Sequence, residues 1–279
     1  MAMAHSTRNN KITRADVLFV ANSIIVHIST FSLALHCTLR NFIYLQPMAQ
    51  KKLLRFARIK TFCNVKEYPK DMPGTWRSFF KNHFPVILEL ACGRGEYTVG
   101  LAAMDPDKNF IGVDVKGNRI YIGAKYAMDN KLSNAAFLRT QIEMLAEYFE
   151  AGEVDEIWIT FPDPQLRTST AKRRLTHPRF LRLYQKILKP GGHIHLKTDS
   201  PDLFYFTKKV IELYGLFLVE ESADVYASAH KPELDIKTHY EGLDIAQSKK
   251  IHYLRFALLD DIPNLDEQLQ EEIKKIENQ

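Results

Sequence analysis

Short apolar runs alternate with helix-length stretches over most of the chain, and this alternation limits the fold more than any other feature. The apolar runs are rich in β-branched or aromatic residues, which is typical of strands buried on both faces of a sheet. They are VILEL (86–90), FIGVD (110–114), EIWITF (156–161) and HIHLK (193–197). The stretches between them, about 95–104, 117–131, 141–151, 177–188 and 201–214, have helix length. We therefore predict an α/β fold with a mostly parallel sheet and helices on both faces.

The last third of the chain predicts how the sheet ends. FLVEES (217–222) and HYLRFALL (252–259) have the character of strands, and we expect an antiparallel hairpin at one edge. The turn Lys189-Pro-Gly-Gly192 is expected to end one helix and begin the next strand. We assign residues 85–262 to this domain, 48–84 to a basic N-terminal segment, and 263–279 to a charged tail that is a surface helix or frayed.

The first 47 residues differ from the rest. Between Val17 and Leu39 there is no Asp, Glu, Lys or Arg, and this length would span a bilayer. Polar residues such as Asn22 and His27 raise the cost of insertion. Because Met48 opens a basic, helix-prone segment, we favour Met48 as the natural start of the protein. Residues 1–47 would then be a mis-called upstream extension with no fold of its own. A weak membrane anchor and an additional packed helix are the alternatives.

The composition permits a polyanionic partner without requiring one. The 279 residues carry a net charge of +5 and a pI of about 8.9. The three cysteines and ten histidines are scattered, and they form neither a disulfide framework nor a metal-ligand spacing. We therefore expect a cytoplasmic protein without a metal. Both a monomer and a homodimer are compatible with such a sheet.

Polar residues and glycines lie at or just after the end of each predicted parallel strand, where ligands bind in open α/β sheets. In chain order they are Glu89, Gly93, Gly95, Asp114, Thr140, Gln141, Asp163 and Asp199. Gly93 and Gly95 allow a sharp turn, and the helix that follows offers free N–H groups. Asp114 comes about 20 residues later, where an acid can bind ribose hydroxyls. The pattern favours a nucleoside-type cofactor, although Asp114 could instead cap the helix near Gly117.

The loop that follows the predicted strand EIWITF, ITFPDPQLRTSTAKRRLT (159–176), combines an acid with clustered cations. Pro162 and Pro164 restrict the backbone around Asp163, so the acid is presented rigidly and could bind a base. The cations expected to bind phosphates are Arg167, Lys172, Arg173 and Arg174. The alternatives are an ordinary turn role for Asp163 and a solvated surface for the cations.

Taken together, these motifs resemble the tRNA (guanine-N(7)-)-methyltransferases over about residues 60–260. The matching stretches are ELACGRGEYT (89–98), Asp114, FPDP (161–164), KRRLT (172–176), KTD (197–199) and THYE (238–241). The resemblance implies a Rossmann-like enzyme that uses S-adenosyl-L-methionine to methylate guanine N7 in the tRNA variable loop, at tRNA position 46. It also implies that Glu89 and Asp114 contact the cofactor.

The resemblance carries over to other residues with two departures. Thr140 and Gln141 stand where the family usually has an acid near the adenine, and Gln165-Leu166-Arg167 replaces the family's Trp-His-Lys. The implied substrate-binding residues in the later stretches are Asp199, Thr238, Tyr240 and Glu241. Asp199 could instead cap the helix after Pro201.

The implied chemistry needs alignment more than acid–base catalysis. Guanine N7 carries an in-plane lone pair and needs no deprotonation, and a carboxylate such as Asp163 can accept from the N1–H and the exocyclic amino group. Two alternatives stay open: a methyltransferase of the same fold acting on another RNA or a small molecule, and a non-catalytic RNA-binding module. The basic loop favours RNA over a small molecule, and the intact Glu89, Gly93, Gly95 and Asp114 favour an enzyme.

Overall fold

The structure is a computed structural model that describes residues 50–227, 229–243 and 249–277. The predictions for residues 1–47 lie outside the described residues. The chain divides into two units, Met1–Leu54 and Arg55–Gln279, and the second carries the sheet and the site. No helix in the described part of the chain combines the length and apolar character needed to cross a membrane.

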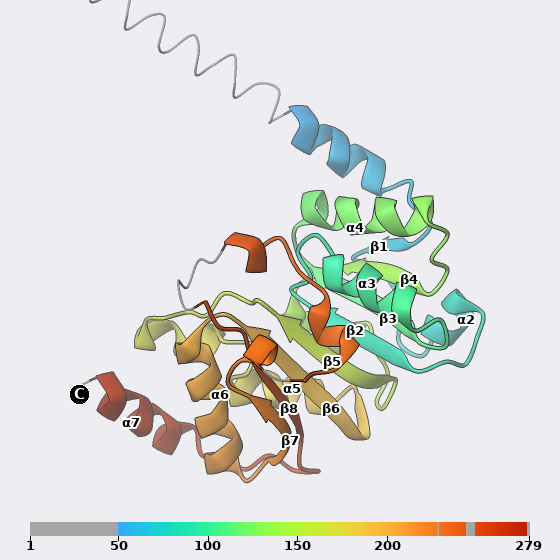
Figure 1. Cartoon of the computed structure of the whole chain (residues 1–279). Helices are drawn as coiled ribbons and strands as arrows, with labels where there is room; N and C mark the ends of the chain where they lie inside the picture. Colours follow the sequence, from blue (N-terminus) through green and yellow to red (C-terminus); the bar gives the residue numbers. More distant parts are fainter. Residues whose placement is uncertain (1–49, 228, 244–248, 278–279) are drawn as a thin grey trace, which may run out of the picture. The chain divides into compact units, whose positions relative to one another are not determined.

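The centre of the second unit is a sheet with eight strands among the described residues (Figure 1). In spatial order they are β1 (Val65–Glu67), β4 (Ala135–Arg139), β3 (Asn109–Asp114), β2 (Val86–Leu90), β5 (Val154–Thr160), β6 (Leu188–Thr198), β8 (His252–Ala257) and β7 (Phe217–Ser222). The first six run parallel, and β8 is antiparallel to both β6 and β7. The predicted mostly parallel sheet with an antiparallel edge pair is confirmed.

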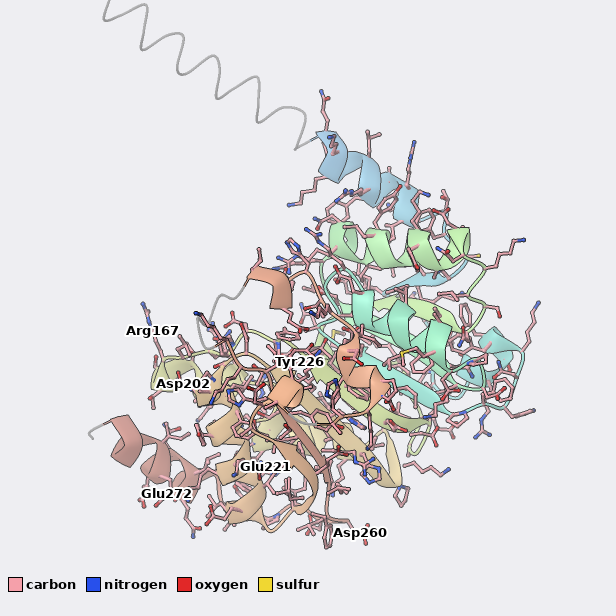
Figure 2. The ribbon with its side chains drawn as sticks, in the orientation of Figure 1. Arg167, Asp202, Glu221, Tyr226, Asp260 and Glu272 are labelled. Carbon is pink, nitrogen blue, oxygen red and sulfur yellow. The ribbon has the colours of Figure 1, made fainter. Side chains whose placement is uncertain are left out.

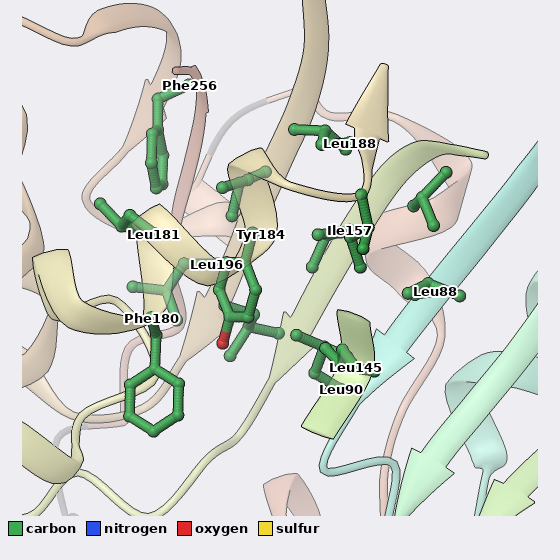
Figure 3. Packing of buried hydrophobic residues seen from close by; sticks show 14 of the residues in the cluster. Leu88, Leu90, Leu145, Ile157, Phe180, Leu181, Tyr184, Leu188, Leu196 and Phe256 are labelled. Atoms are coloured by element: carbon green, nitrogen blue, oxygen red, sulfur yellow. The ribbon is translucent and has the colours of Figure 1, made fainter. Parts of the chain in front are cut away.

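Successive residues of the central strands enter two separate hydrophobic cores, one on each face of the sheet. In β2, Leu88 and Leu90 belong to one core and Ile87 to the other, as the two-residue period of a strand requires. Figure 3 shows the first core, where Tyr184 and its helical neighbours pack against the strands. Because both faces are covered, the strands are apolar at nearly every position, which is why their sequences do not alternate.

Different helices cover the two faces of the sheet. The helices α3 (Glu96–Met104) and α4 (Gly117–Asp129) pack on β2, β3 and β4. On the other core lie α5 (Pro178–Gln185), α6 (Pro201–Tyr214) and the 3₁₀ helix η1 (Ile142–Glu147). The predicted helix at 141–151 is thus a short 3₁₀ turn. Lys189–Gly192 lies inside β6, where pairing with β5 shifts register between Val154 and Glu156, so these residues form an irregularity within the strand.

The domain extends beyond the predicted limits of 85 and 262. Strand β1 pairs with β4, and Trp76 in α2 (Trp76–Phe80) is fully buried with its indole donating to the Tyr148 carbonyl at 2.9 Å. At the other end, α7 (Asp266–Glu277) buries Leu269 against the core. Asp266 also pairs with Arg182 of α5 at 2.7 Å. These flanking segments therefore belong to the folded unit.

The strand order reverses direction next to β2. The chain runs from β2 outward through β3 and β4, and then returns to place β5 on the other side of β2. In open α/β sheets, ligands bind beyond the carboxyl ends of the strands at such a switch point. The residues that follow Leu90 and Thr160 therefore lie where a ligand is expected.

Candidate active site

A tight glycine turn connects β2 to α3. Gly93 and Gly95 have φ angles of +56° and +72°, in the left-handed region that favours glycine. A Cβ at Gly95 would lie 2.5 Å from a ring carbon of Phe137, so no other residue fits there without displacing the core. Ala91, the first residue after β2, also has a positive φ of 55°. A non-glycine residue held in this region is a strained feature of the kind found at functional sites.

Asp114, at the end of β3, fixes this turn. One carboxylate oxygen accepts from the Gly93 amide at 2.9 Å and the other from the Lys116 amide at 2.7 Å. The N-cap of α4 is Lys116, so Asp114 lies outside the capping position considered as its alternative role. A carboxylate has about four acceptor sites, so these two bonds leave room for ribose hydroxyls.

A cavity of about 450 Å³ opens beside Asp114. Its lining residues come from the carboxyl ends of the strands and from η1, α5 and the basic loop. They are Ala91, Asp114, Val115, Thr140, Gln141, Ile142, Glu143, Arg173, Leu175, Arg179 and Phe180. The cavity therefore combines apolar walls with polar groups at one strand edge, which is typical of a nucleoside site.

The side chain of Thr140 tests whether this cavity fits a nucleoside. Its side chain is fully buried, and its hydroxyl has no hydrogen-bond partner among the described residues. A buried hydroxyl without a partner is costly, and a ligand with a polar edge would satisfy it. Gln141 is exposed at the same cavity. The residues present thus fit an adenine nucleoside although the family's usual acid is absent.

Glu89 lies beneath the turn rather than in the cavity. Its side chain is buried, and it accepts from the Thr98 amide at 2.7 Å, from the Thr98 hydroxyl, and from the Thr160 hydroxyl at 2.8 Å. Burial raises the pKa of Glu89 to about 7, even though these hydrogen bonds act in the opposite direction. In this structure Glu89 joins β2, α3 and β5, and its predicted cofactor contact stays a prediction.

The loop after β5 presents Asp163 at the switch point. Phe161 and Gln165 both have positive φ angles, 47° and 48°, on either side of the Pro-Asp-Pro sequence. Asp163 is exposed, and one of its carboxylate oxygens accepts from the Gln165 amide at 3.0 Å. The turn role considered for Asp163 is therefore present, and it holds the carboxylate outward, so the two roles are compatible.

The four cations predicted to bind phosphates divide into two kinds. Arg167, Lys172 and Arg173 are exposed on or beside η2 (Thr168–Arg173), and Arg167 is labelled in Figure 2. Arg174 is only 6% exposed. Its guanidinium donates to the carbonyls of Pro164 and Gln165, both at 3.1 Å, and lies 4.4 Å from the centre of the Phe206 ring. Arg174 thus supports the Asp163 loop, and its predicted phosphate contact stays a prediction.

Asp199 follows β6 directly and is partly exposed. The cap of α6 is Ser200, whose hydroxyl accepts from the Leu203 amide at 3.3 Å. The capping role considered for Asp199 is therefore filled by its neighbour.

The Thr238–Glu241 loop lies over the glycine turn. A Cβ at Gly93 would be 3.5 Å from the Tyr240 ring, so the ring and the turn are close neighbours. Thr238 accepts from the Glu241 amide at 3.2 Å, which shapes the loop. The Glu241 carboxylate contacts Lys197 at 3.1 Å and the Tyr226 hydroxyl at 2.5 Å. The structure therefore places the Thr238–Glu241 loop next to the glycine turn, and the predicted substrate contacts of these residues stay predictions.

Several residues at the site were not found from the sequence. Arg179 and Phe180 reach the cavity from α5, and Arg119 of α4 lies over the Tyr240 ring at 5.5 Å. Nothing in a helical sequence marks which turn will face a cavity built by another element. Lys197 stands inside the KTD stretch, so its position could have been singled out, although its burial could not.

Comparison with known proteins agrees with this geometry. Residues 83–254 match a family model described as "Putative methyltransferase". The chain is 47% identical over 213 residues to a tRNA (guanine-N(7)-)-methyltransferase of Porphyromonas gingivalis (72% of this chain, 86% of that protein). It is 46% identical over 221 residues to that of Bacteroides thetaiotaomicron (76% of this chain, 87% of that protein).

A solved structure supports the fold separately. The 16S rRNA methyltransferase KamB superposes with a TM-score of 0.52 at 15% identity, covering 70% of this chain and 96% of that one. This likeness shows the methyltransferase fold only. The sequence similarity and the family match go further: the chain belongs to the tRNA (guanine-N(7)-)-methyltransferase family.

Proposed function

We propose that this protein methylates N7 of guanosine in the tRNA variable loop, at tRNA position 46, with S-adenosyl-L-methionine as the donor. The observation that carries the proposal is the juxtaposition, at one switch point, of the glycine turn after β2 and the exposed Asp163 after β5. The names of the similar proteins support the same substrate and reaction.

The chain's residues fit the donor part by part. Asp114 would accept from the ribose hydroxyls, and Thr140 or Gln141 would bind the polar edge of the adenine between the apolar walls of the cavity. The N–H groups of Glu96 and Tyr97 at the start of α3 would bind the carboxylate of the methionine end, since the Thr98 N–H already donates to Glu89. When bound, S-adenosyl-L-methionine supplies a methyl group on an electrophilic sulfonium.

Asp163 would orient the guanine. Its carboxylate can accept from both N1–H and the exocyclic amino group, which fixes the ring in its own plane and directs N7 toward the cofactor site. Because N7 needs no deprotonation, the rate depends mainly on holding the base in line at close range. Phe161 and Gln165 have backbone angles in the left-handed region, which gives the loop one defined conformation. The acid is therefore held in position before the base binds.

The exposed Arg167, Lys172 and Arg173 would bind the tRNA backbone beside Asp163. Each neutralised phosphate releases counterions, so affinity should fall as salt increases. On this proposal Asp199, Thr238, Tyr240 and Glu241 form the rest of the substrate site, residues 1–47 are not needed for activity, and the protein acts in the cytoplasm as a monomer or homodimer without a metal.

The test is to incubate the protein with radiolabelled S-adenosyl-L-methionine and an unmodified tRNA transcript. Aniline cleavage after reduction should then map the methyl group to one guanosine in the variable loop. The matched control is the same transcript with 7-deazaguanosine at that position, which lacks the nucleophile and should stay unlabelled. Labelling of a 16S rRNA fragment in place of tRNA would instead support a same-fold enzyme with another RNA substrate.

A further inference from the structure

Lys197 is a fully buried lysine to which no role has been given so far. It is the penultimate residue of β6, directly before Thr198 and Asp199, and its side chain is 0% exposed. A lysine is almost never buried in this way unless its charge is paired. Its partners therefore indicate what it does.

All three N–H groups of the Lys197 ammonium have acceptors in the segment that follows β7. They are the Leu234 carbonyl at 2.7 Å, the Ile236 carbonyl at 3.0 Å and the Glu241 carboxylate at 3.1 Å, and the Tyr226 hydroxyl is a longer fourth contact at 3.4 Å. An ammonium has three donors and no acceptor, so this set satisfies it completely. The three acceptors span η4 (Pro232–Asp235) and η5 (Glu241–Leu243), with Thr238 and Tyr240 between them.

Aromatic rings surround the same ammonium. The ring centres of Tyr97 and Phe161 lie 5.5 Å from Nζ, and that of Tyr226 lies 5.7 Å away. These distances are within the range of cation–π attraction. Phe161 is the residue that begins the Asp163 loop, and Tyr226, labelled in Figure 2, donates to Glu241 from η3 (Val225–Ala227). Lys197 thus contacts both loops that are proposed to hold the base.

Side chains rather than strand pairing provide the other attachments of the 232–243 segment, and among them Leu234 is buried in a hydrophobic core. Within its described residues it forms only 3₁₀ turns and no strand pairing. The Tyr97 hydroxyl donates to the Glu233 carbonyl at 2.5 Å, and the Ile236 side chain packs against Gly100 of α3. With so little backbone pairing, the position of Thr238, Tyr240 and Glu241 depends strongly on the side chains that hold the segment.

Removing the ammonium would destabilise the 232–243 segment. Two carbonyls and the Glu241 carboxylate would lose their buried donor, and the side chain of Glu241 is only 7% exposed. An unpaired buried charge is strongly unfavourable, so the segment would move to let water reach it. Burial also lowers the pKa of Lys197, while Glu241 opposes that shift and favours the charged form.

We propose that Lys197 is a positioning residue that locks the 232–243 segment over the cofactor turn and aligns it with the Asp163 loop. The inference rests on the proposed function for its catalytic consequence. Lys197 acts through Glu241 and the two carbonyls, and does not itself touch the substrate.

The test compares the wild type with Lys197→Met, which keeps the length of the side chain and removes the ammonium. Trypsin cleavage after the exposed Lys237 reports opening of the segment and should become about tenfold faster. The kcat for tRNA methylation should fall by about tenfold or more, because misplacement near the base is costly. The KM for tRNA should change by less than about threefold, because the exposed cations of the basic loop are intact.

Lys189→Met is the matched control, since Lys189 lies on the same strand with a side chain 61% exposed. It should match the wild type in both measurements. A kcat for Lys197→Met equal to that of the wild type would overturn the inference, whatever the cleavage rate. If Lys197→Met does not fold, Tyr226→Phe is the second test, because it removes a hydrogen bond to Glu241. A kcat reduced by at least about threefold supports the inference, and an unchanged kcat overturns it. An inactive wild type would instead reject the proposed function.

Discussion

The Glu89 carboxylate accepts a 2.8 Å hydrogen bond from the hydroxyl of Thr160, and this bond joins the carboxyl ends of two adjacent strands at the switch point. Glu89 precedes the glycine turn, and Thr160 precedes the loop that carries Asp163. The other Glu89 oxygen accepts from the Thr98 amide of α3. The cofactor turn and the proposed base-binding loop are therefore held by one buried carboxylate.

The first prediction concerns the pH dependence of stability through Glu89. Its folded pKa of about 7 is above the unfolded value of 4.5, so the folded state binds a proton more tightly. The resulting stabilisation is full below pH 4.5 and is lost as the pH rises through 7. In Glu89→Gln, whose amide can donate to Thr160 and accept from Thr98, this dependence should disappear. The stability of the wild type relative to the variant should fall by about 3 kcal/mol between pH 4.5 and pH 8.

Urea unfolding at a series of pH values measures this difference. Glu96→Gln is the control, since Glu96 is a partly buried carboxylate in the first turn of the same helix. A stability difference between wild type and Glu89→Gln that stays constant with pH would contradict the prediction.

The second prediction separates the two roles of Asp163. Asp163→Asn keeps an oxygen that can accept from the Gln165 amide, so the turn should persist and the melting temperature should change by less than about 2 °C. The variant loses the acceptor for one guanine donor and the negative charge. We expect kcat to fall about 100-fold, with donor affinity within about threefold of the wild type.

Steady-state kinetics and calorimetric titration of the donor measure the two parameters. Asp202→Asn, on the exposed first turn of α6, is the matched control and should leave both unchanged. Near wild-type kcat in Asp163→Asn would mean that the residue only shapes the turn.

The fold was accessible from the sequence because its strands are buried on both faces. Runs such as VILEL at 86–90 are apolar except at Glu89, and the structure places a strand there with the predicted ends. The parts that differed depend on tertiary pairing. Strand β1 has three partly buried residues and exists because β4 offers an open edge, and the Lys189–Gly192 irregularity arises from the register between β5 and β6.

Site residues determined by local structure could be predicted from the sequence, and those determined by tertiary contacts could not. Gly93, Gly95 and Asp114 were predictable because backbone geometry and hydrogen bonding within one strand–turn–helix unit determine them. The burial of Arg174 was not, because it depends on Phe206 and on carbonyls brought near by α6 and the loop fold. A run of cations in a sequence does not show which one faces the protein interior.

The third prediction uses this difference between neighbouring arginines. Arg173→Gln removes an exposed charge, so tRNA affinity should weaken and the salt dependence of binding should decrease by about one unit of slope. Arg174→Gln removes buried hydrogen bonds to Pro164 and Gln165, so it should destabilise the fold by about 2 kcal/mol.

Binding at several salt concentrations and urea unfolding give the two readouts for both variants. Arg173→Gln should leave stability unchanged to within about 0.5 kcal/mol, because surface substitutions have small effects. If both variants reduced the salt slope equally without loss of stability, the assignment of Arg174 to a supporting role would be wrong.

The fourth prediction concerns His177, the N-cap of α5, which carries the cavity residues Arg179 and Phe180. The neutral ring accepts from the Arg179 amide at 3.1 Å, and burial lowers the pKa of His177 to about 4. Since the unfolded value is 6.5, the stabilisation is full above pH 6.5 and is lost as the pH falls through 4, by about 3 kcal/mol in total.

His177→Asn tests this because its side-chain oxygen can replace the ring nitrogen as the cap acceptor without titrating in this range. Urea unfolding between pH 7 and pH 4 should show that the stability of the wild type falls relative to that of the variant as the pH is lowered. His83→Asn, at an exposed histidine, should follow the wild type. Parallel curves for wild type and His177→Asn would show that protonation of the cap does not control the stability of this cavity wall.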